Sequence, residues 1–138
     1  MAGLSFNVQS GVNLQSNTIQ NYTEYATGSA YTGTSTTVTA NSNVVRYVLN
    51  NNTTVTLPSN QPGVGSALKT IVLMFTQDGT GGRTMTLAAP SGESIKYNNA
   101  LTQPAVVSGA GKTTIYTCMK FDSDSVWRVS LSYIDAWG

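Results

Sequence analysis

Hydrophobic and polar positions along the chain centre on the stretch from Lys69 to Leu87. Its first half contains five consecutive apolar residues, Ile71 to Phe75, which predicts a strand that is covered on both faces. In its second half, Met85 and Leu87 alternate with threonines, which predicts a strand with one apolar face. Glycines between the two halves permit a tight turn. The stretch therefore predicts a buried central hairpin.

The predicted turn of this hairpin has the sequence Asp-Gly-Thr-Gly-Gly-Arg. We expect its two charged residues to face each other across the mouth of the hairpin, and its glycines to supply positive φ. The residues assigned to this structural turn are Asp78, Gly79, Gly81, Gly82 and Arg83. Because the turn contains no reactive group, we interpret it as architecture and not as a site of chemistry.

Segments of alternating polarity also precede and follow the central stretch. Strands are predicted over residues 44–50, 53–58, 94–97, 112–121 and 126–133. The last two flank the turn from Asp122 to Ser125 and predict an antiparallel hairpin. Its first strand places four residues on one face, namely Ile115, Thr117, Met119 and Phe121. Its second strand likewise places Trp127, Val129, Leu131 and Tyr133 on one face.

No segment has the period of a long helix. Seven short strands separated by turns predict an all-β fold, either an antiparallel β-sandwich or a jelly-roll-like barrel. We assign this domain to residues 44 to 138 and an extended N-terminal arm to residues 1 to 43. The arm region is too polar to offset the entropy of ordering it alone.

The predicted arm carries apolar and aromatic side chains that suit contact with a neighbouring protein. Tyrosine supplies a large contact area at low entropy cost, and alternating apolar residues suit strand addition to an open sheet edge. The candidate partner-binding residues are Leu4, Phe6, Val8, Tyr22, Tyr25 and Tyr31. A plain flexible tail is the alternative interpretation.

The composition indicates a surface that other subunits can bury. Only 9% of the 138 residues are charged, against about 25% in soluble domains, and the net charge is +1. Hydroxyl and amide side chains cost less to desolvate than charged ones. The chain lacks a basic run, so we expect no nucleic-acid binding. It also lacks a long apolar run and a signal-peptide pattern, so we expect no membrane insertion and synthesis in a cytosol.

The sequence gives no pattern of catalysis or cofactor binding. It contains no histidine and a single cysteine, Cys118, which excludes the common nucleophile systems, ordinary zinc sites and an intrachain disulfide. Residues 109 to 113 resemble the end of a phosphate-binding loop, but the earlier glycine is missing and a strand pattern follows. The pair Asp122 and Asp124 lacks the glutamate that closes a calcium loop. We therefore expect no enzyme activity, no cofactor and no metal.

Residues 44 to 131 resemble a β-domain found repeatedly in structural proteins of tailed bacteriophages. The specific motif is QDGTGGRT, from Gln77 to Thr84. A lysine-aromatic strand, a loop with proline, a glycine-rich turn and an aromatic-rich hairpin follow it in the family's order. Tyr97 stands where the family often has tryptophan, which leaves the expected fold unchanged. The resemblance implies a β-module of a virus particle, assembled in the host cytoplasm.

The chain has neither heptads nor a sequence repeat of the kind that a long fibre uses. With the resemblance, this favours a head decoration (cement) protein that binds the major capsid protein and copies of itself, as a homotrimer. The alternative is a tail-fibre or tail-tip protein that recognises host surface glycans through tyrosine and tryptophan faces. A soluble sugar-binding module is a third possibility.

Overall fold

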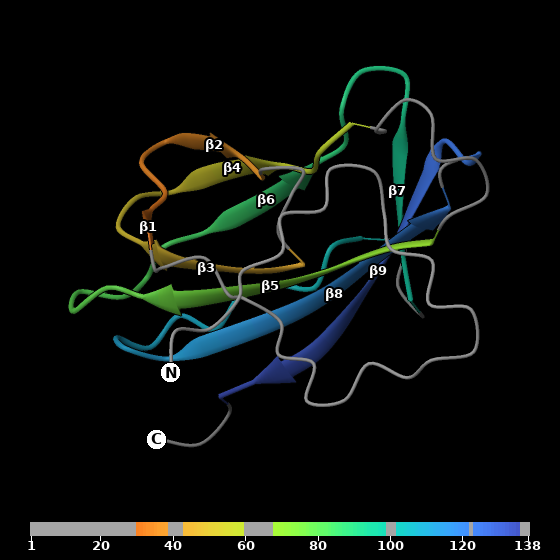
Figure 1. Ribbon diagram of the computed structural model, residues 1–138. Helices are drawn as coiled ribbons and strands as arrows, with labels where there is room; N and C mark the ends of the chain where they lie inside the picture. Colours follow the sequence, from red (N-terminus) through yellow and green to blue (C-terminus); the bar gives the residue numbers. More distant parts are fainter. Residues whose placement is uncertain (1–29, 39–42, 60–67, 99–101, 122, 136–138) are drawn as a thin grey trace, which may run out of the picture.

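The computed structural model describes residues 30–38, 43–59, 68–98, 102–121 and 123–135. These residues form nine strands and no helix, so the predicted all-β fold is confirmed for this part of the chain. The strands form a six-stranded sheet with the order β1-β3-β5-β8-β9-β7 and a three-stranded sheet with the order β2-β4-β6 (Figure 1). The strands are β1 (Ala30–Tyr31), β2 (Ser35–Thr37), β3 (Val44–Leu49), β4 (Thr53–Thr56), β5 (Leu68–Gln77), β6 (Met85–Ala88), β7 (Ser94–Tyr97), β8 (Thr113–Phe121) and β9 (Val126–Ile134).

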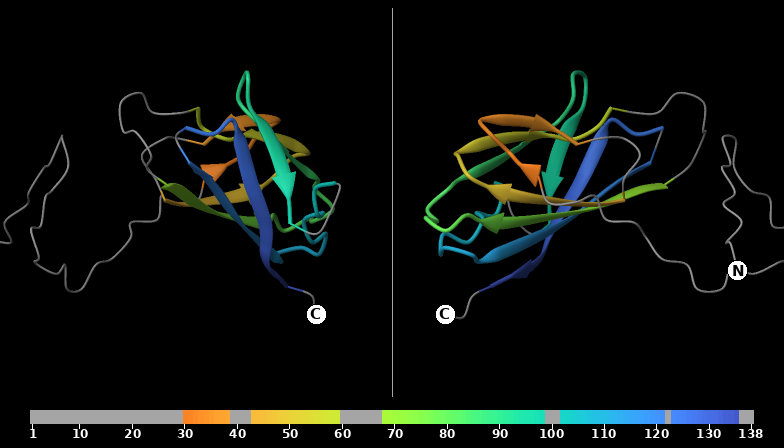
Figure 2. Two further views of the ribbon diagram at one scale, coloured as in Figure 1. Left: turned by 90° about the vertical axis from the view of Figure 1, so that its right-hand side faces the viewer. Right: turned by 60° about the vertical axis from the view of Figure 1, so that its left-hand side comes forward.

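The first six strands alternate between the two sheets. The chain passes from β1 in the large sheet to β2 in the small one, returns to β3, and repeats this path through β4, β5 and β6. Among these six strands, neighbours within the same sheet are therefore parallel, and Tyr47 of β3 lies between Ala30 and Phe75. In the small sheet, Val55 of β4 lies between Thr36 and Leu87. Strands β1 to β6 therefore form three turns of a flattened coil, with the small sheet lying over β1, β3 and β5 (Figure 2).

The predicted antiparallel arrangement is wrong for most of the described strands. Five of their seven pairings are parallel, and only β5 with β8 and β8 with β9 are antiparallel. The predicted central hairpin is also wrong, because β5 and β6 belong to different sheets. Residues 78 to 84 carry the chain from one sheet to the other instead of back along the same sheet. The sheets do not close into a barrel.

Asparagine side chains join successive turns of the coil where the chain crosses between the sheets. Asn50 Oδ1 accepts a hydrogen bond from the Gly33 N–H at 3.1 Å, in the preceding turn of the coil. Asn52 Oδ1 accepts one from the Thr84 N–H at 2.9 Å, in the following turn. Both backbone donors lie in crossing loops, where no strand supplies an acceptor. The asparagine-rich segment 50–52 therefore connects its own crossing loop with those that contain Gly33 and Thr84.

The core lies between the two sheets. Its fifteen buried residues include β5 side chains that alternate inward, and Tyr47 and Leu49 of β3. On β5, Ile71, Leu73 and Phe75 are buried, whereas Val72 and Met74 between them are only partly buried. The prediction that both faces of this strand are covered is therefore wrong for the described structure. Its second apolar face points away from the core.

The hairpin of β8 and β9 was predicted correctly, and its first strand buries the face opposite to the apolar one. Tyr116, Cys118 and Lys120 point inward, while Ile115 and Met119 point outward. On β9, Trp127 and Val129 are buried as one face. A register shift between Ile115 and Tyr116 then ends the regular alternation, so Tyr133 lies beside Ile115 and is half exposed.

The segment from residue 102 to 107 covers the inner side of β8. Tyr116 Oη donates a hydrogen bond to the Pro104 carbonyl, and Thr114 Oγ1 accepts one from the Val107 N–H. The Gln103 side chain accepts a hydrogen bond from the Leu87 N–H at 2.7 Å and donates one to the Met85 carbonyl at 2.8 Å. Its amide thereby occupies the edge of β6, where a further strand could otherwise pair.

Part of the predicted arm belongs to the β-domain. Residues 30 to 38 contribute β1, β2 and the buried side chains Thr32 and Val38, so the boundary at residue 43 is wrong. Tyr31 lies on β1 with 72% of its surface exposed. The other candidate arm residues lie outside the described residues: Leu4, Phe6, Val8, Tyr22 and Tyr25. None of the described segments is a helix that could cross a membrane.

Candidate docking face

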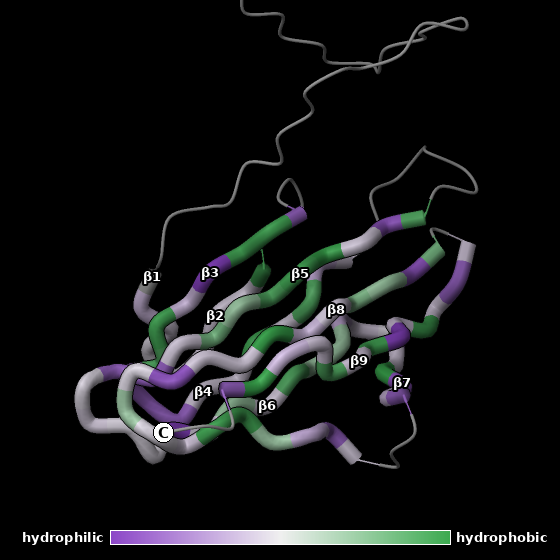
Figure 3. Tube along the Cα trace, turned by 90° about the horizontal axis from the view of Figure 1, so that it is seen from below, coloured by the Kyte–Doolittle hydropathy of each residue, from purple (hydrophilic) through white to green (hydrophobic). Residues whose placement is uncertain are grey.

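The six-stranded sheet has a second face, which points away from the three-stranded sheet. We call it the outer face and define it by the side chains of β3, β5, β8 and β9 that alternate with the core residues. Figure 3 views the molecule from this side, with the four strands next to one another. Its members are Val44, Arg46, Val48, Leu68, Thr70, Val72, Met74, Thr76, Thr113, Ile115, Thr117, Met119, Phe121, Val126, Arg128, Ser130 and Tyr133.

The outer face is apolar although no second layer of described residues covers it. Strand registers align Val44, Val72 and Thr117 in one row, and Met74 and Ile115 in the next. Towards the ends of the strands, Leu68 is 52% exposed, Phe121 47% and Tyr133 51%. Contiguous apolar patches on a protein surface mark contact sites. This geometry indicates a docking surface.

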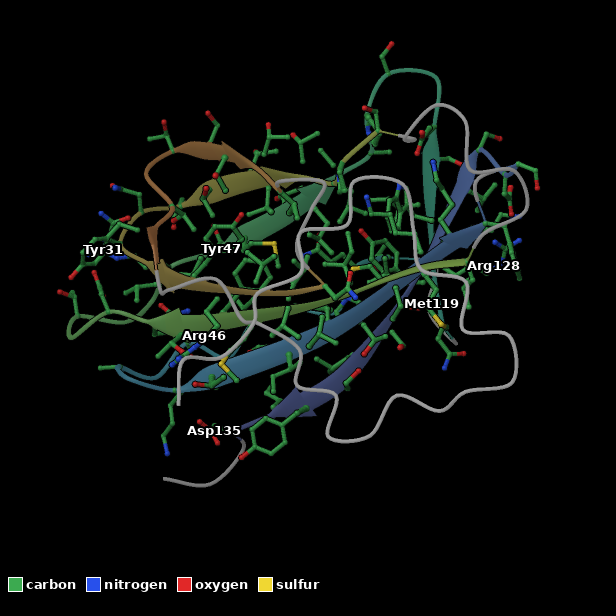
Figure 4. All side chains as sticks on the ribbon, in the orientation of Figure 1. Tyr31, Arg46, Tyr47, Met119, Arg128 and Asp135 are labelled. Carbon is green, nitrogen blue, oxygen red and sulfur yellow. The ribbon has the colours of Figure 1, made fainter. Side chains whose placement is uncertain are left out.

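Cationic groups lie at the margins of the outer face. Figure 4 shows Arg46 and Met119 on the side of the sheet away from Tyr47. Arg128 is held by Asp124, whose Oδ2 lies 2.6 Å from Arg128 Nη1. The hydrogen bond from Arg128 and its charge lower the pKa of Asp124. This ion pair fixes the guanidinium beside Met119, its neighbour across the strand pair.

An acidic group marks the opposite end of the same face. Asp135 accepts a hydrogen bond from Tyr133 Oη at 2.5 Å and one from the Thr113 N–H at 2.9 Å. These two bonds, with the charge of Lys112, lower the pKa of Asp135. The same carboxylate raises the pKa of Tyr133. Tyr133 and Asp135 therefore form one negatively charged unit at the end of β9.

Two shallow hollows lie near the end of the outer face where β8 and β9 meet. The larger one, of about 300 Å³, is lined by Lys96, Tyr97, Asn98, Met119, Arg128, Val129 and Ser130. The smaller one, of about 180 Å³, is lined by Leu68, Met119, Lys120, Phe121 and Arg128. Because Met119 and Arg128 line both hollows, the two adjoin. They can receive apolar side chains of a docked partner.

A buried ion pair lies behind this end of the face. Lys120 Nζ is 2.6 Å from Glu93 Oε2, and the two side chains are 1% and 10% exposed. Trp127 Nε1 donates to the same carboxylate oxygen at 2.8 Å, and the ammonium lies 5.3 Å from the centre of the tryptophan ring. Lys120 Nζ forms no hydrogen bond with Glu93 in this geometry. The negative charge of the Glu93 carboxylate and the face of the Trp127 ring therefore stabilise the buried ammonium. The cluster therefore connects Glu93, the residue before β7, with Lys120 of β8 and Trp127 of β9.

The octapeptide from Gln77 to Thr84 forms the crossing loop between the sheets. Gln77 is buried and donates to the Arg83 and Val107 carbonyls, while its oxygen accepts from the Arg83 N–H. Asp78 accepts from the Thr80 and Gly81 N–H groups and pairs with Arg83 Nη2 at 3.1 Å. The hydrogen bond from the Gly81 N–H, with those from Arg83 and Thr80, lowers the pKa of Asp78. Gly79 and Gly82 have open space around them.

Two glycine-rich segments that are distant in the sequence pack on each other. The Gly82 N–H donates to the Ser108 carbonyl at 2.7 Å, and the Gly111 N–H donates to the Asp78 carbonyl at 3.2 Å. Residues 109 to 112 thus form the turn that precedes β8 and contact the crossing loop. The carboxylates of Glu93 and Asp124 each pair with a separate cation. Among the described residues, no cluster of acidic or cysteine side chains could hold a metal ion.

Comparison of the chain with protein-family models, with curated proteins and with solved structures gave no match. Sequence reasoning missed the outer face as a docking site, although the signal was present. The unbroken run from Ile71 to Phe75 has apolar residues on both sides of β5, and the fold covers only one of them.

Proposed function

We propose that this protein is a structural module of a bacteriophage particle, which acts by packing its outer face against other protein subunits. The observation that carries the proposal is the apolar outer face of the six-stranded sheet. In this proposal the protein is part of the virion, where it acts as a head decoration (cement) protein on the major capsid protein. The resemblance of residues 77 to 84 to phage β-domains supports the particle as the setting.

The composition of the surface supports a role in permanent assembly. A chain with 9% charged residues has few groups whose desolvation opposes burial between subunits. The interior of protein interfaces is likewise poor in charge and rich in aromatic residues and methionine. Met74, Met119, Phe121 and Tyr133 supply such side chains on the outer face.

A second function, a tail-fibre or tail-tip receptor-binding protein, is favoured by the parallel coil. Parallel coils of strands are one of the architectures from which extended proteins are built. The absence of a sequence repeat argued against a fibre, and the three turns of the coil weaken that argument. In this function, the hollow beside Tyr97 and Arg128 would receive part of a host glycan.

Particles assembled without this protein provide the test. Purified protein is added to them, unbound protein is removed, and the copies per particle are measured by quantitative mass spectrometry. Heads and tails are then separated before the measurement is repeated. Many copies on heads support the decoration function, and a few copies on tails with binding of the isolated protein to host glycans support the alternative. Absence from both fractions contradicts a virion role.

A further inference from the structure

We propose that two copies of this chain pair face to face through their outer faces, with a two-fold axis parallel to the strands and between β5 and β8. The inference deepens the proposed function, on which it rests, by naming the partner of the outer face as a second copy. Sheets pack in this way about 10 Å apart, with their side chains interdigitating.

The order of the strands makes this arrangement self-complementary. β5 and β8 are the central pair, and β3 and β9 flank them on either side. A two-fold rotation about the line between β5 and β8 places β3 of one copy over β9 of the other. The registers put Arg46, Met74, Ile115 and Tyr133 in one row across the four strands. Arg46 of each copy therefore lies over Tyr133 of the partner subunit.

The groups brought together in this way match in charge and shape. Tyr133 Oη donates to Asp135, so the ring and the carboxylate form one unit. An arginine guanidinium stacks on aromatic rings and binds carboxylates. Arg46 is exposed on β3 and directed to the outer side of the sheet (Figure 4). The two-fold symmetry forms this contact twice, once at each side of the apolar centre.

The alternative face-to-face orientation lacks this match. With the axis perpendicular to the strands, β3 of one copy lies over β3 of the other. This axis exchanges the two ends of β9, so Tyr133 and Asp135 lie towards Arg128 of the partner subunit, a guanidinium that already pairs with Asp124. Each Arg46 then faces no acidic group of the outer face. The axis parallel to the strands is therefore the one that gives Arg46 an acidic partner.

The area of the outer face is sufficient for a stable pair. The four strands β3, β5, β8 and β9 contain 6, 10, 9 and 9 residues, which at about 3.3 Å of length and 4.8 Å of width per residue cover about 540 Å². Two copies of the face then bury about 1,100 Å² in total, which exceeds the roughly 1,000 Å² expected of a biological interface.

Light scattering after size-exclusion chromatography of the full chain, at micromolar concentration, tests the proposal. We expect a dimer. Thr117→Arg places a charge next to Val72 at the centre of the face, and we expect it to produce monomers. Thr86→Arg is the matched control, because Thr86 is exposed on the other sheet, and we expect it to remain dimeric. Circular dichroism of each variant checks that it is folded.

A second pair of variants tests the charged contact without disturbing the centre of the face. Arg46→Glu places two acidic groups together, and we expect the dissociation constant of the dimer to rise at least tenfold. Thr54→Glu adds an acidic group at an exposed position of β4, in the three-stranded sheet and away from the outer face, and we expect less than a twofold change. A monomer, a trimer, or a dimer unaffected by Thr117→Arg and Arg46→Glu overturns the proposal. Because these tests use isolated protein, their outcome is independent of particle binding.

Discussion

Tyr47 stacks on Phe75 with ring centroids 5.7 Å apart and planes inclined by 17°. The two rings belong to successive turns of the coil, in neighbouring parallel strands at the same register position. Phe75 also meets the edge of the Tyr116 ring at 6.1 Å. One aromatic column therefore joins the coil to the antiparallel hairpin, and burial raises the pKa of both tyrosines.

Removing the middle ring of this column should destabilise the whole domain. Phe75 is 1% exposed, so we expect Phe75→Ala to lower the free energy of unfolding by about 3–5 kcal/mol, as for other buried aromatic residues. Urea denaturation followed by tryptophan fluorescence measures this loss. Thr86→Ala, at an exposed position, is the control and should stay within about 0.5 kcal/mol of the wild type. A loss below about 1 kcal/mol for Phe75→Ala would contradict the core position.

Gly81 should tolerate no side chain. Its φ is +70°, and an added Cβ would lie 2.6 Å from the Ser108 carbonyl oxygen and 2.7 Å from the Ala110 nitrogen. Positive φ alone costs a non-glycine residue about 1–2 kcal/mol, and the backbone contacts add to it. We expect Gly81→Ala to cost more than about 2 kcal/mol in thermal or chemical unfolding. Gly79→Ala is the matched control, because Gly79 has open space and no positive φ, and equal losses in both variants would refute the packing argument.

Removing only one partner of the buried ion pair should destabilise the protein. Glu93→Gln leaves the Lys120 ammonium buried without its counter-charge, which costs about 3–5 kcal/mol in comparable sites. The double variant Glu93→Gln with Lys120→Met removes both charges, so we expect it to recover most of that loss. Chemical denaturation of the two single variants and the double variant measures the coupling. Additive losses would show that the two side chains do not interact.

Alkaline pH should destabilise the domain through two buried groups. Burial raises the pKa of the Cys118 thiol from 9.0 to about 12, and that of the Tyr116 hydroxyl from 10.0 to about 12. Between pH 9 and 12, the unfolded chain loses these protons while the folded chain keeps them. Stability is therefore constant below about pH 9 with respect to these groups and falls as pH rises to 12.

The pH dependence of the unfolding free energy in Cys118→Ala and Tyr116→Phe measures each contribution. Each variant should fall less steeply than the wild type over this range. Cys118 should also resist thiol reagents in the folded protein, because it is buried and protonated. Rapid labelling at neutral pH in the absence of denaturant would contradict its buried position.

The sequence by itself determined the class of secondary structure and the positions of most strands. Alternation of polar and apolar residues has a period of two only in extended chain, so 44–50, 53–58, 112–121 and 126–133 could be assigned without tertiary information. Turn chemistry located the breaks between them. The hairpin of β8 and β9 followed from a short polar turn between two such strands.

The tertiary structure decided how the strands pair. A short loop of asparagine or glycine residues suits a hairpin within one sheet and a crossing between two sheets equally well, so local pattern does not distinguish antiparallel from parallel neighbours. The three turns of the coil also have unequal loops, of three residues at 50–52 and seven at 78–84, so they leave no fixed period in the sequence. Burial of Lys120 was likewise decided by a distant partner, Glu93. The outer face also depends on tertiary structure. The apolar run of β5 indicates that both of its sides favour burial, but it does not indicate which element covers each side.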